Sequence, residues 1–180
     1  GTLSPPWVRA MFGAAYQAKR MNIPIILDPV GAGATTYRTS TARELLEEIT
    51  PSIIRGNASE IMAIVKENAK TKGVESTISS HTAVDMARQI NKTYGSVVCV
   101  SGETDYIING NDETRVMNGH PMMARVTGMG CIATALCGAF AAVNHVFAEA
   151  TAQAMAVMGI AGEIAVENVP GPGSLQVRFL

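Results

Sequence analysis

Short apolar runs alternate with amphipathic and Ala-rich stretches along the whole chain. Apolar runs that are too short for helices are typical of strands buried on both faces of a sheet. Strands are predicted at residues 24–27, 52–54, 96–100 and 175–179. Residues 105–108 and 114–118 are predicted to pair as an antiparallel hairpin, because a polar stretch beginning Asn109-Gly110-Asn111 connects them.

The stretches between the strands predict helices. These helices cover residues 5–20, 41–49, 58–67, 80–93, 131–143 and 147–166. Ser40 precedes the second helix, and Asn57 can cap the third, with Glu60 three residues on as in a capping box. Residues 68–79 are polar and irregular, and the run Pro170-Gly171-Pro172-Gly173 ends the last helix.

The alternation of strands and helices indicates an α/β fold class, with a mostly parallel central sheet flanked by helices. At 180 residues, 47% of them hydrophobic and 16% charged, the chain is predicted to form one domain. A net charge of −1 without a long run of one sign argues against a nucleic-acid groove or a basic membrane patch. Three cysteines without paired spacing, and no visible secretion signal, favour a reducing cytoplasmic location.

Polar residues follow three of the predicted parallel strands: Asp28, Arg55 and Ser101. Ligands of parallel sheets bind beyond the carboxyl ends of the strands, so this coincidence is the first indication of a site. An Asp there is costly unless it is paired or works on a cation, the alternative being an Asp that only caps its own turn. Gly31 and Gly33 follow Asp28, but this loop has neither the Gly-Lys-Ser/Thr of a Walker A loop nor a dinucleotide fingerprint.

Arg55 and Glu60 carry a second candidate chemistry. The guanidinium of Arg55 has the fork geometry that clamps phosphate oxygens. Asn57 and Glu60 share one face of a helix start, where they could hold Mg²⁺ through water. The alternative is the capping box alone, and both readings are compatible. The Ser101 hydroxyl could likewise reach a nucleotide phosphate, or belong to an ordinary turn after a strand.

The loop Thr127-Gly128-Met129-Gly130-Cys131 opens directly onto a helix. Its glycines let the backbone approach a ligand, and the helix start supplies free N–H groups, so the loop suits a transferring phosphoryl group. An ordinary tight turn into a helix is the other interpretation. The Cys131 thiol stands in the first helical turn, where the helix dipole favours a thiolate that could take a proton from a substrate hydroxyl. A small buried apolar cysteine is the alternative.

In this order, the motifs around Asp28, Arg55, Glu60 and Cys131, with the closing Gly171-Pro-Gly-Ser174, resemble hydroxyethylthiazole kinases of the ribokinase-like superfamily. The resemblance implies ATP-dependent phosphorylation of the hydroxyl of 4-methyl-5-(2-hydroxyethyl)thiazole in thiamine salvage. Cys131 stands where most ribokinase-like enzymes carry an Asp as catalytic base, which makes the resemblance specific.

The resemblance also implies roles for individual residues. Arg55 and Ser101 would contact ATP, Gly128 would lie against the thiazole, and Cys131 would act at the reacting hydroxyl. Mg²⁺ would be held by Asp28 and Glu60. The family usually has Thr at the position of Ser101, but the hydroxyl is retained. Family members are homotrimers with active sites between subunits.

Residue 1 matches a point well inside the family's chain, so residues 1–180 are expected to be the C-terminal two thirds of the family's single domain. Such a fragment is expected to expose a sheet edge and apolar surface. Two other hypotheses remain beside the thiazole kinase. One is a ribokinase-like kinase or ATP-dependent hydrate dehydratase acting on another small molecule. The other is an inactive fragment that only binds nucleotide.

Overall fold

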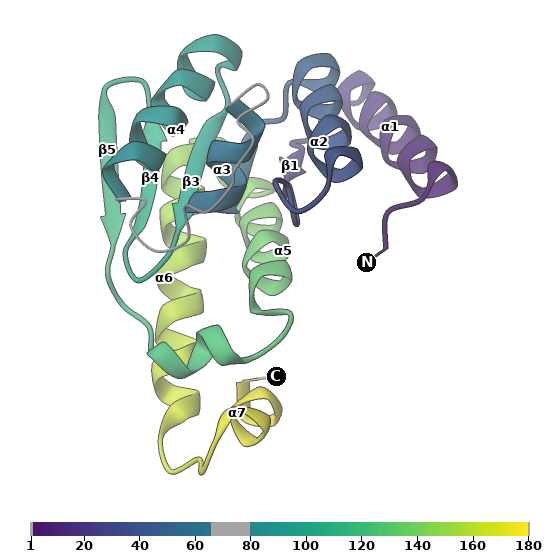
Figure 1. Ribbon diagram of the computed structural model, residues 1–180. Helices are drawn as coiled ribbons and strands as arrows, with labels where there is room; N and C mark the ends of the chain where they lie inside the picture. Colours follow the sequence, from purple (N-terminus) through teal and green to yellow (C-terminus); the bar gives the residue numbers. More distant parts are fainter. Residues whose placement is uncertain (1, 66–79, 180) are drawn as a thin grey trace.

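The computed structural model describes residues 2–65 and 80–179, and a five-stranded mixed sheet forms the centre of this part of the chain (Figure 1). The strands lie in sequence order: β1 (Ile26–Leu27), β2 (Ile53–Asn57), β3 (Val97–Ser101), β4 (Asp105–Asn109) and β5 (Asp112–Val116). Strands β1 to β3 are parallel, whereas β3, β4 and β5 form an antiparallel meander. The predicted α/β fold is confirmed, with its parallel part confined to the first three strands.

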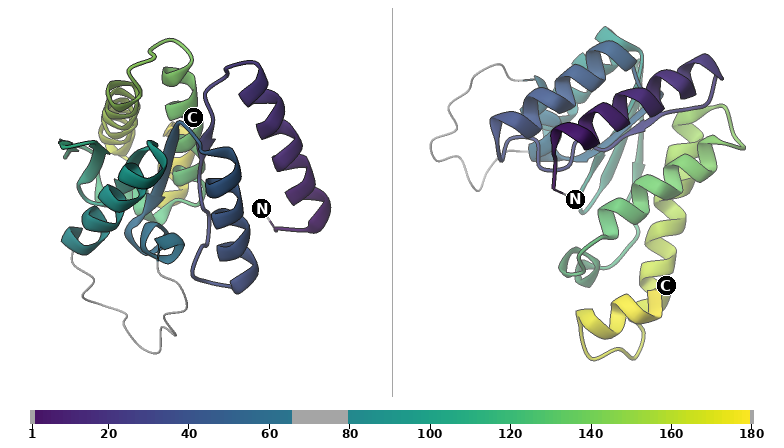
Figure 2. Two further views of the ribbon diagram at one scale, coloured as in Figure 1. Left: turned by 90° about the horizontal axis from the view of Figure 1, so that it is seen from above. Right: turned by 90° about the vertical axis from the view of Figure 1, so that its right-hand side faces the viewer.

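Helices cover both faces of the sheet (Figures 1 and 2). One layer contains α2 (Thr36–Ile49), α3 (Ala58–Val65) and α4 (Ser80–Tyr94), with α1 (Pro5–Arg20) lying against α2. The other layer contains α5 (Met129–Ala141), α6 (Phe147–Val166) and α7 (Pro172–Phe179), together with the short 3₁₀ helix η1 (Pro121–Arg125). None of the helices within residues 2–65 and 80–179 has the length and apolar character that a membrane crossing requires.

Consecutive apolar residues in the central strands pack in opposite layers. In the pairs Ile53/Ile54, Val97/Val98 and Ile107/Ile108, the first residue packs with α5 and α6 and the second with α2, α3 or α4. Side chains alternate between the faces of a strand, so a strand that is covered on both faces needs an unbroken apolar run. All five residues of β3 are buried, which confirms this interpretation for the third run.

Most predicted elements agree with the structure within a few residues. Helices α1, α4 and α6 begin and end within one residue of their predicted bounds, and β4 and β5 form the predicted hairpin. Asn109 pairs with Asp112, so the turn is Gly110-Asn111, and Gly110 takes the positive φ of 62° that such a turn requires. The irregular segment predicted at 68–79 lies outside the described residues.

The predicted start of the second helix is wrong by five residues. Thr35, not Ser40, is the residue that caps α2, because its backbone is extended and its hydroxyl accepts the Arg38 N–H at 3.2 Å. Ser40 lies inside the helix and donates to the Tyr37 carbonyl. Thr35 and Ser40 are both residue types that can cap a helix, so residue type alone does not decide between them.

The predicted final strand is also wrong, because residues 172–179 form helix α7. Pro172 is its first residue, a position where a missing N–H costs nothing. Leu175 is fully buried, whereas Val177 is 80% exposed, so the apolar alternation from Leu175 does not mark one buried face. Over so few residues, strand and helix periodicities cannot be told apart.

Candidate functional site

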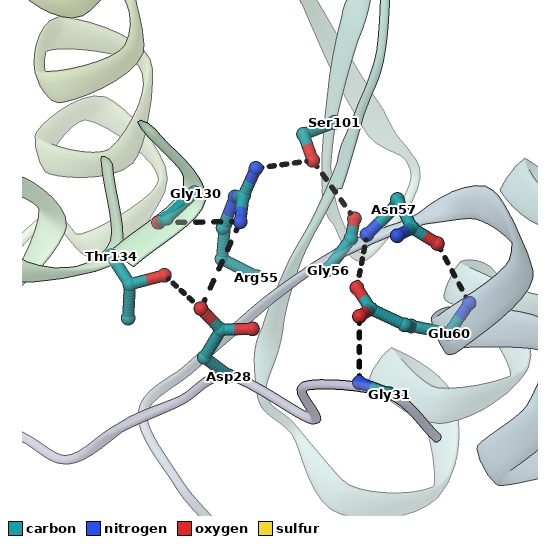
Figure 3. A network of polar contacts seen from close by, with 9 residues as sticks. All are labelled: Asp28, Gly31, Arg55, Gly56, Asn57, Glu60, Ser101, Gly130 and Thr134. Atoms are coloured by element: carbon teal, nitrogen blue, oxygen red, sulfur yellow. Dashed lines mark hydrogen bonds and ion pairs between the residues drawn. The ribbon is translucent and has the colours of Figure 1, made fainter. Parts of the chain in front are cut away.

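The polar residues predicted at the strand ends meet at one edge of the sheet (Figure 3). Asp28 follows β1, Arg55 lies within β2, and Ser101 is the last residue of β3. The parallel register places Asn57, at the end of β2, beside Ser101. The start of α5 faces this edge, so residues far apart in the sequence form one polar network.

Arg55 is the centre of this network. Its Nη2 donates to the Ser101 hydroxyl at 2.7 Å, and its Nη1 donates to the Gly130 carbonyl at 3.3 Å. Nη1 also lies 3.8 Å from Oδ2 of Asp28, and both charged side chains are less than 15% exposed. The Nε atom is buried and has no protein partner. The guanidinium therefore ties β1, β3 and α5 together while keeping donor capacity.

Asp28 is held from two sides. The Thr134 hydroxyl of α5 donates to Oδ2 at 2.7 Å, on the same oxygen that lies near Arg55. Burial raises the pKa of the Asp28 carboxyl above its usual value, and the nearby carboxylate of Glu60 adds to that rise. The Thr134 hydrogen bond and the Arg55 charge lower the pKa and offset part of the effect. Asp28 is thus a desolvated carboxylate with a second carboxylate nearby.

Glu60 forms the predicted capping box. Its N–H donates to Oδ1 of Asn57 at 2.9 Å, while its Oε2 accepts the Asn57 N–H at 3.0 Å. The other oxygen, Oε1, accepts the N–H of Gly31 at 2.9 Å. Gly31 has a φ of +71°, which favours glycine at this position. Glu60 therefore fixes the loop after Asp28 against the start of α3.

The donor chemistry at this edge fits a divalent cation. Among the described residues, no cluster of three or more His, Cys, Asp or Glu side chains forms a complete metal cage. Asp28 and Glu60 instead offer two neighbouring carboxylates, which is the kind of partial ligand set that suits Mg²⁺ with its own water and phosphate ligands. Two like charges brought close together also favour a cation between them.

Helix α5 starts at Met129, and Gly128 is its N-cap with a φ of +97°. A Cβ on Gly128 would meet no atom within 4 Å, so the backbone there stays open to a ligand. The first N–H groups of the helix lack intrahelical partners and carry the positive end of the dipole. Gly128 and Cys131 lie within two residues of Gly130 at this helix start, although neither belongs to the network in Figure 3.

Gly130 is required by the approach of Arg55. A Cβ at this position would lie 2.8 Å from the Arg55 Nη1, and three contacts pin that guanidinium in place. We expect Gly130→Ala to displace Arg55 from these contacts, at a cost in stability of roughly 1 kcal/mol. Urea unfolding measures this loss.

Gly138→Ala on the same helix is the matched control, because its Cβ would lie 3.6 Å from the nearest atom, which is ordinary contact. Equal free energies of unfolding for the Gly130→Ala and Gly138→Ala variants would contradict this role of Gly130.

The three cysteines differ in accessibility. Cys131 is exposed, whereas Cys99 and Cys137 are buried. Desolvation raises the pKa of the Cys137 thiol to about 11 and that of Cys99 well above its usual value. We therefore expect iodoacetamide at a pH of about 8 to label one thiol in the native chain and three after unfolding. Peptide mass spectrometry should place the native label on Cys131; rapid native labelling of Cys137 would contradict the packing of α5.

A pocket of about 370 Å³ lies beside the Arg55–Ser101 pair. It is lined by Ala58, Val100, Ser101, Gly102, Glu103, Thr104 and Tyr106. Asp105 shapes its rim by accepting the Gly102 N–H at 3.0 Å. Of these residues, the sequence singled out Ser101 alone for a role, although the turn that follows it was one of the predicted alternatives.

Thr134 is the other residue that the sequence did not single out. Its spacing from Cys131 could have indicated a place in the site, because residues three apart lie on the same face of a helix. It is also polar in an otherwise apolar stretch from Ile132 to Leu136.

Comparison with known proteins gives one consistent family. The family model described as "HK: Hydroxyethylthiazole kinase family" matches residues 1–180. A protein of Syntrophus aciditrophicus named hydroxyethylthiazole kinase is 64% identical over 181 residues, covering all of this chain and 67% of that protein. A protein of the same name from Leptospira biflexa is 49% identical over 180 residues, with the same coverage. The chain spans about two thirds of the length of these relatives.

Solved structures show the same relationship. The hydroxyethylthiazole kinase protein from Pyrococcus horikoshii OT3 superposes with a TM-score of 0.87 and 37% identity, over 99% of this chain and 66% of that one. A Bacillus subtilis pyridoxal kinase, solved as an ADP complex, has a TM-score of 0.61 and 20% identity, over 86% of this chain and 58% of that one. The second likeness is one of fold alone.

Proposed function

The chain belongs to the hydroxyethylthiazole kinase family, and on this premise we propose that it carries the site that phosphorylates the hydroxyl of 4-methyl-5-(2-hydroxyethyl)thiazole with ATP in thiamine salvage. The observation that carries the proposal is the position of Arg55. Its guanidinium contacts Ser101 and Gly130 and lies near Asp28 at the carboxyl edge of the sheet. A fixed guanidinium beside the N-terminus of a helix can stabilise the negative charge of a transferring phosphoryl group.

In this proposal Arg55 and Ser101 contact the phosphates of ATP. Nη1 and Nη2 of Arg55 each make one hydrogen bond to the described residues and each carry a second N–H, so the guanidinium can donate further. The pocket beside Ser101 would hold part of the nucleotide, since a cavity of about 370 Å³ is within the range of small-molecule sites. The free N–H groups at the start of α5 would face the transferred phosphoryl group.

Asp28 and Glu60 would hold Mg²⁺ together with water and phosphate oxygens. When bound, Mg²⁺ supplies positive charge that neutralises the phosphates during transfer. Glu60 keeps its structural role in this arrangement. Each of its two carboxylate oxygens accepts one backbone N–H and has a further lone pair with which to hold the cation.

Cys131 would act as the catalytic base. Its side chain is exposed, and in the thiolate form it would take the proton of the substrate hydroxyl while that oxygen forms a bond to the γ-phosphorus of ATP. The bond from the γ-phosphorus to the bridging oxygen breaks, and ADP leaves with that electron pair. The thiazole ring would lie against Gly128, where no Cβ obstructs it.

A substrate comparison tests this proposal against its alternatives. With ATP and Mg²⁺ present, we expect ADP release with hydroxyethylthiazole and none above background with pyridoxal or adenosine. ADP release with another alcohol instead would favour a different ribokinase-like activity. Retained ATP binding without turnover of any alcohol would favour a fragment that only binds nucleotide.

A homotrimer is part of the same proposal. Helix α6 exposes Val157, Ile160 and Ile164, which are each more than 40% accessible and spaced along one side of the helix. Apolar surface of this kind is often covered by a subunit contact. Light scattering should give three times the mass of one chain; the mass of a single chain would contradict the trimer.

A further inference from the structure

Thr134 uses its hydroxyl differently from other helical threonines of this chain. Thr39, Thr93 and Thr151 each donate to the carbonyl four residues earlier, at 2.7 to 2.9 Å. That local bond is common for a threonine inside a helix. Thr134 instead donates to Oδ2 of Asp28 at 2.7 Å, across 106 positions of sequence.

The local acceptor is engaged by another residue. The carbonyl four residues before Thr134 is that of Gly130, which accepts Nη1 of Arg55 at 3.3 Å. The same Nη1 lies 3.8 Å from the Asp28 oxygen that Thr134 contacts. Thr134, Arg55 and Asp28 therefore form one set of contacts, in which the threonine joins α5 directly to the carboxylate.

Both contacts to Asp28 fall on Oδ2. Figure 3 shows the second oxygen pointing away from Thr134, toward the side on which Glu60 lies. The terminal torsion of an Asp side chain rotates easily, so a single ion pair does not fix this orientation. An arginine near a carboxylate also favours a two-pronged contact with both oxygens, which would draw the second oxygen away from Glu60.

We propose that Thr134 is a positioning residue that holds Oδ2 of Asp28 on the Arg55 side and so leaves Oδ1 available to hold a divalent cation together with Glu60. The proposal rests on the proposed function, since it concerns the Mg²⁺ of that site. It adds Thr134 to the site residues predicted from the sequence and gives it the role of orienting the Asp28 carboxylate.

The test compares Thr134→Val, which keeps the shape but loses the donor, with Thr134→Ser, which keeps the hydroxyl. The measured quantity is the affinity for Mn²⁺, detected by electron paramagnetic resonance in the presence of a non-hydrolysable ATP analogue and without thiazole. We expect Thr134→Val to weaken Mn²⁺ binding roughly 10–100-fold, as losses of residues behind a metal ligand do. Thr134→Ser should stay within about threefold of the wild type, because it keeps the donor.

Thr151→Val on α6 is the matched control, because Thr151 makes only the local bond to Phe147 among the contacts described. It should leave Mn²⁺ binding unchanged. Thr134→Ala removes the same donor with a higher helix propensity, so it must reproduce the loss if the valine variant is unstable. In turnover assays, the Mg²⁺ concentration for half-maximal rate should rise while the KM for hydroxyethylthiazole stays constant.

The outcomes separate this proposal from the proposed function. The role of Thr134 would be overturned if a folded Thr134→Val or Thr134→Ala variant bound Mn²⁺ with wild-type affinity. It would also be overturned if Thr134→Ser lost as much Mn²⁺ affinity as Thr134→Val. A wild-type chain that does not bind Mn²⁺ with the ATP analogue would overturn it as well. Normal Mn²⁺ binding with the expected variant pattern, but no thiazole phosphorylation, would support the role of Thr134 and contradict the proposed function.

Discussion

Replacing Arg55 with methionine is expected to lower kcat/KM for ATP by more than about 100-fold, because the charged donor that we propose for the phosphates is lost. It also removes the cation beside Asp28 and the donors to Ser101 and Gly130. Both side chains of the ion pair are mostly buried, so we expect the free energy of unfolding to fall by about 2–3 kcal/mol. Steady-state kinetics and urea unfolding measure the two losses.

The stability loss in Arg55→Met should depend on pH. Burial raises the pKa of Asp28 in the folded chain, and Arg55 opposes that rise, so the variant should have a still higher folded pKa. When the pKa of a carboxyl is higher in the folded than in the unfolded chain, the folded chain binds the proton more tightly. The free energy of unfolding therefore falls as the pH rises toward the folded pKa, and it recovers as the pH falls. The variant's deficit should therefore be larger at a pH of about 8 than at about 5.

Arg55→Lys is the control, since it keeps the charge but not the two-pronged geometry, and it should recover stability better than activity. Unchanged ATP kinetics in Arg55→Met would contradict the role of Arg55 in the nucleotide site. A stability loss that grows as the pH falls would contradict the assignment of the loss to Asp28.

Replacing Cys131 with alanine is expected to lower kcat by roughly 10²–10⁴-fold, which is the usual contribution of a general base. The thiol is exposed and outside the network around Arg55, so the variant should keep the wild-type melting temperature and bind ATP within about twofold. Stopped assays for kcat, thermal unfolding and ATP titration separate these effects.

Cys131→Ser should also lose most of the activity, because a neutral hydroxyl is a much weaker proton acceptor than a thiolate. Unchanged turnover in either variant would remove the thiol from the mechanism. A large loss of ATP affinity would instead show that Cys131 matters for binding, contrary to its exposed position.

The sequence predicts the position of a site where backbone periodicity and strand order decide it. Asp28, Arg55 and Ser101 were placed at one edge because they follow apolar runs, and parallel strands bring such residues together. The reciprocal bonds of Asn57 and Glu60 were predictable as well, because a capping box depends on a local spacing.

The sequence does not predict side-chain contacts between elements that are far apart along the chain. The bond from Thr134 to Asp28 depends on where α5 packs against the end of β1, and no local pattern reports that. The same holds for the approach of Arg55 to Gly130, which explains the glycine by a tertiary contact and not by a turn. Helix α7 was missed because its eight residues are too few to separate the helix and strand periods.

The most direct measurement of the central claim follows the γ-phosphoryl group itself. The chain is incubated with Mg²⁺, hydroxyethylthiazole and ATP labelled in the γ-phosphate, and the products are separated and identified by mass spectrometry. We predict that the label is found on the hydroxyethyl oxygen of the thiazole, and that both Arg55→Met and Cys131→Ala reduce formation of this product at least about 100-fold. Label found only in ATP or inorganic phosphate, or equal product formation by the wild type and both variants, would contradict it.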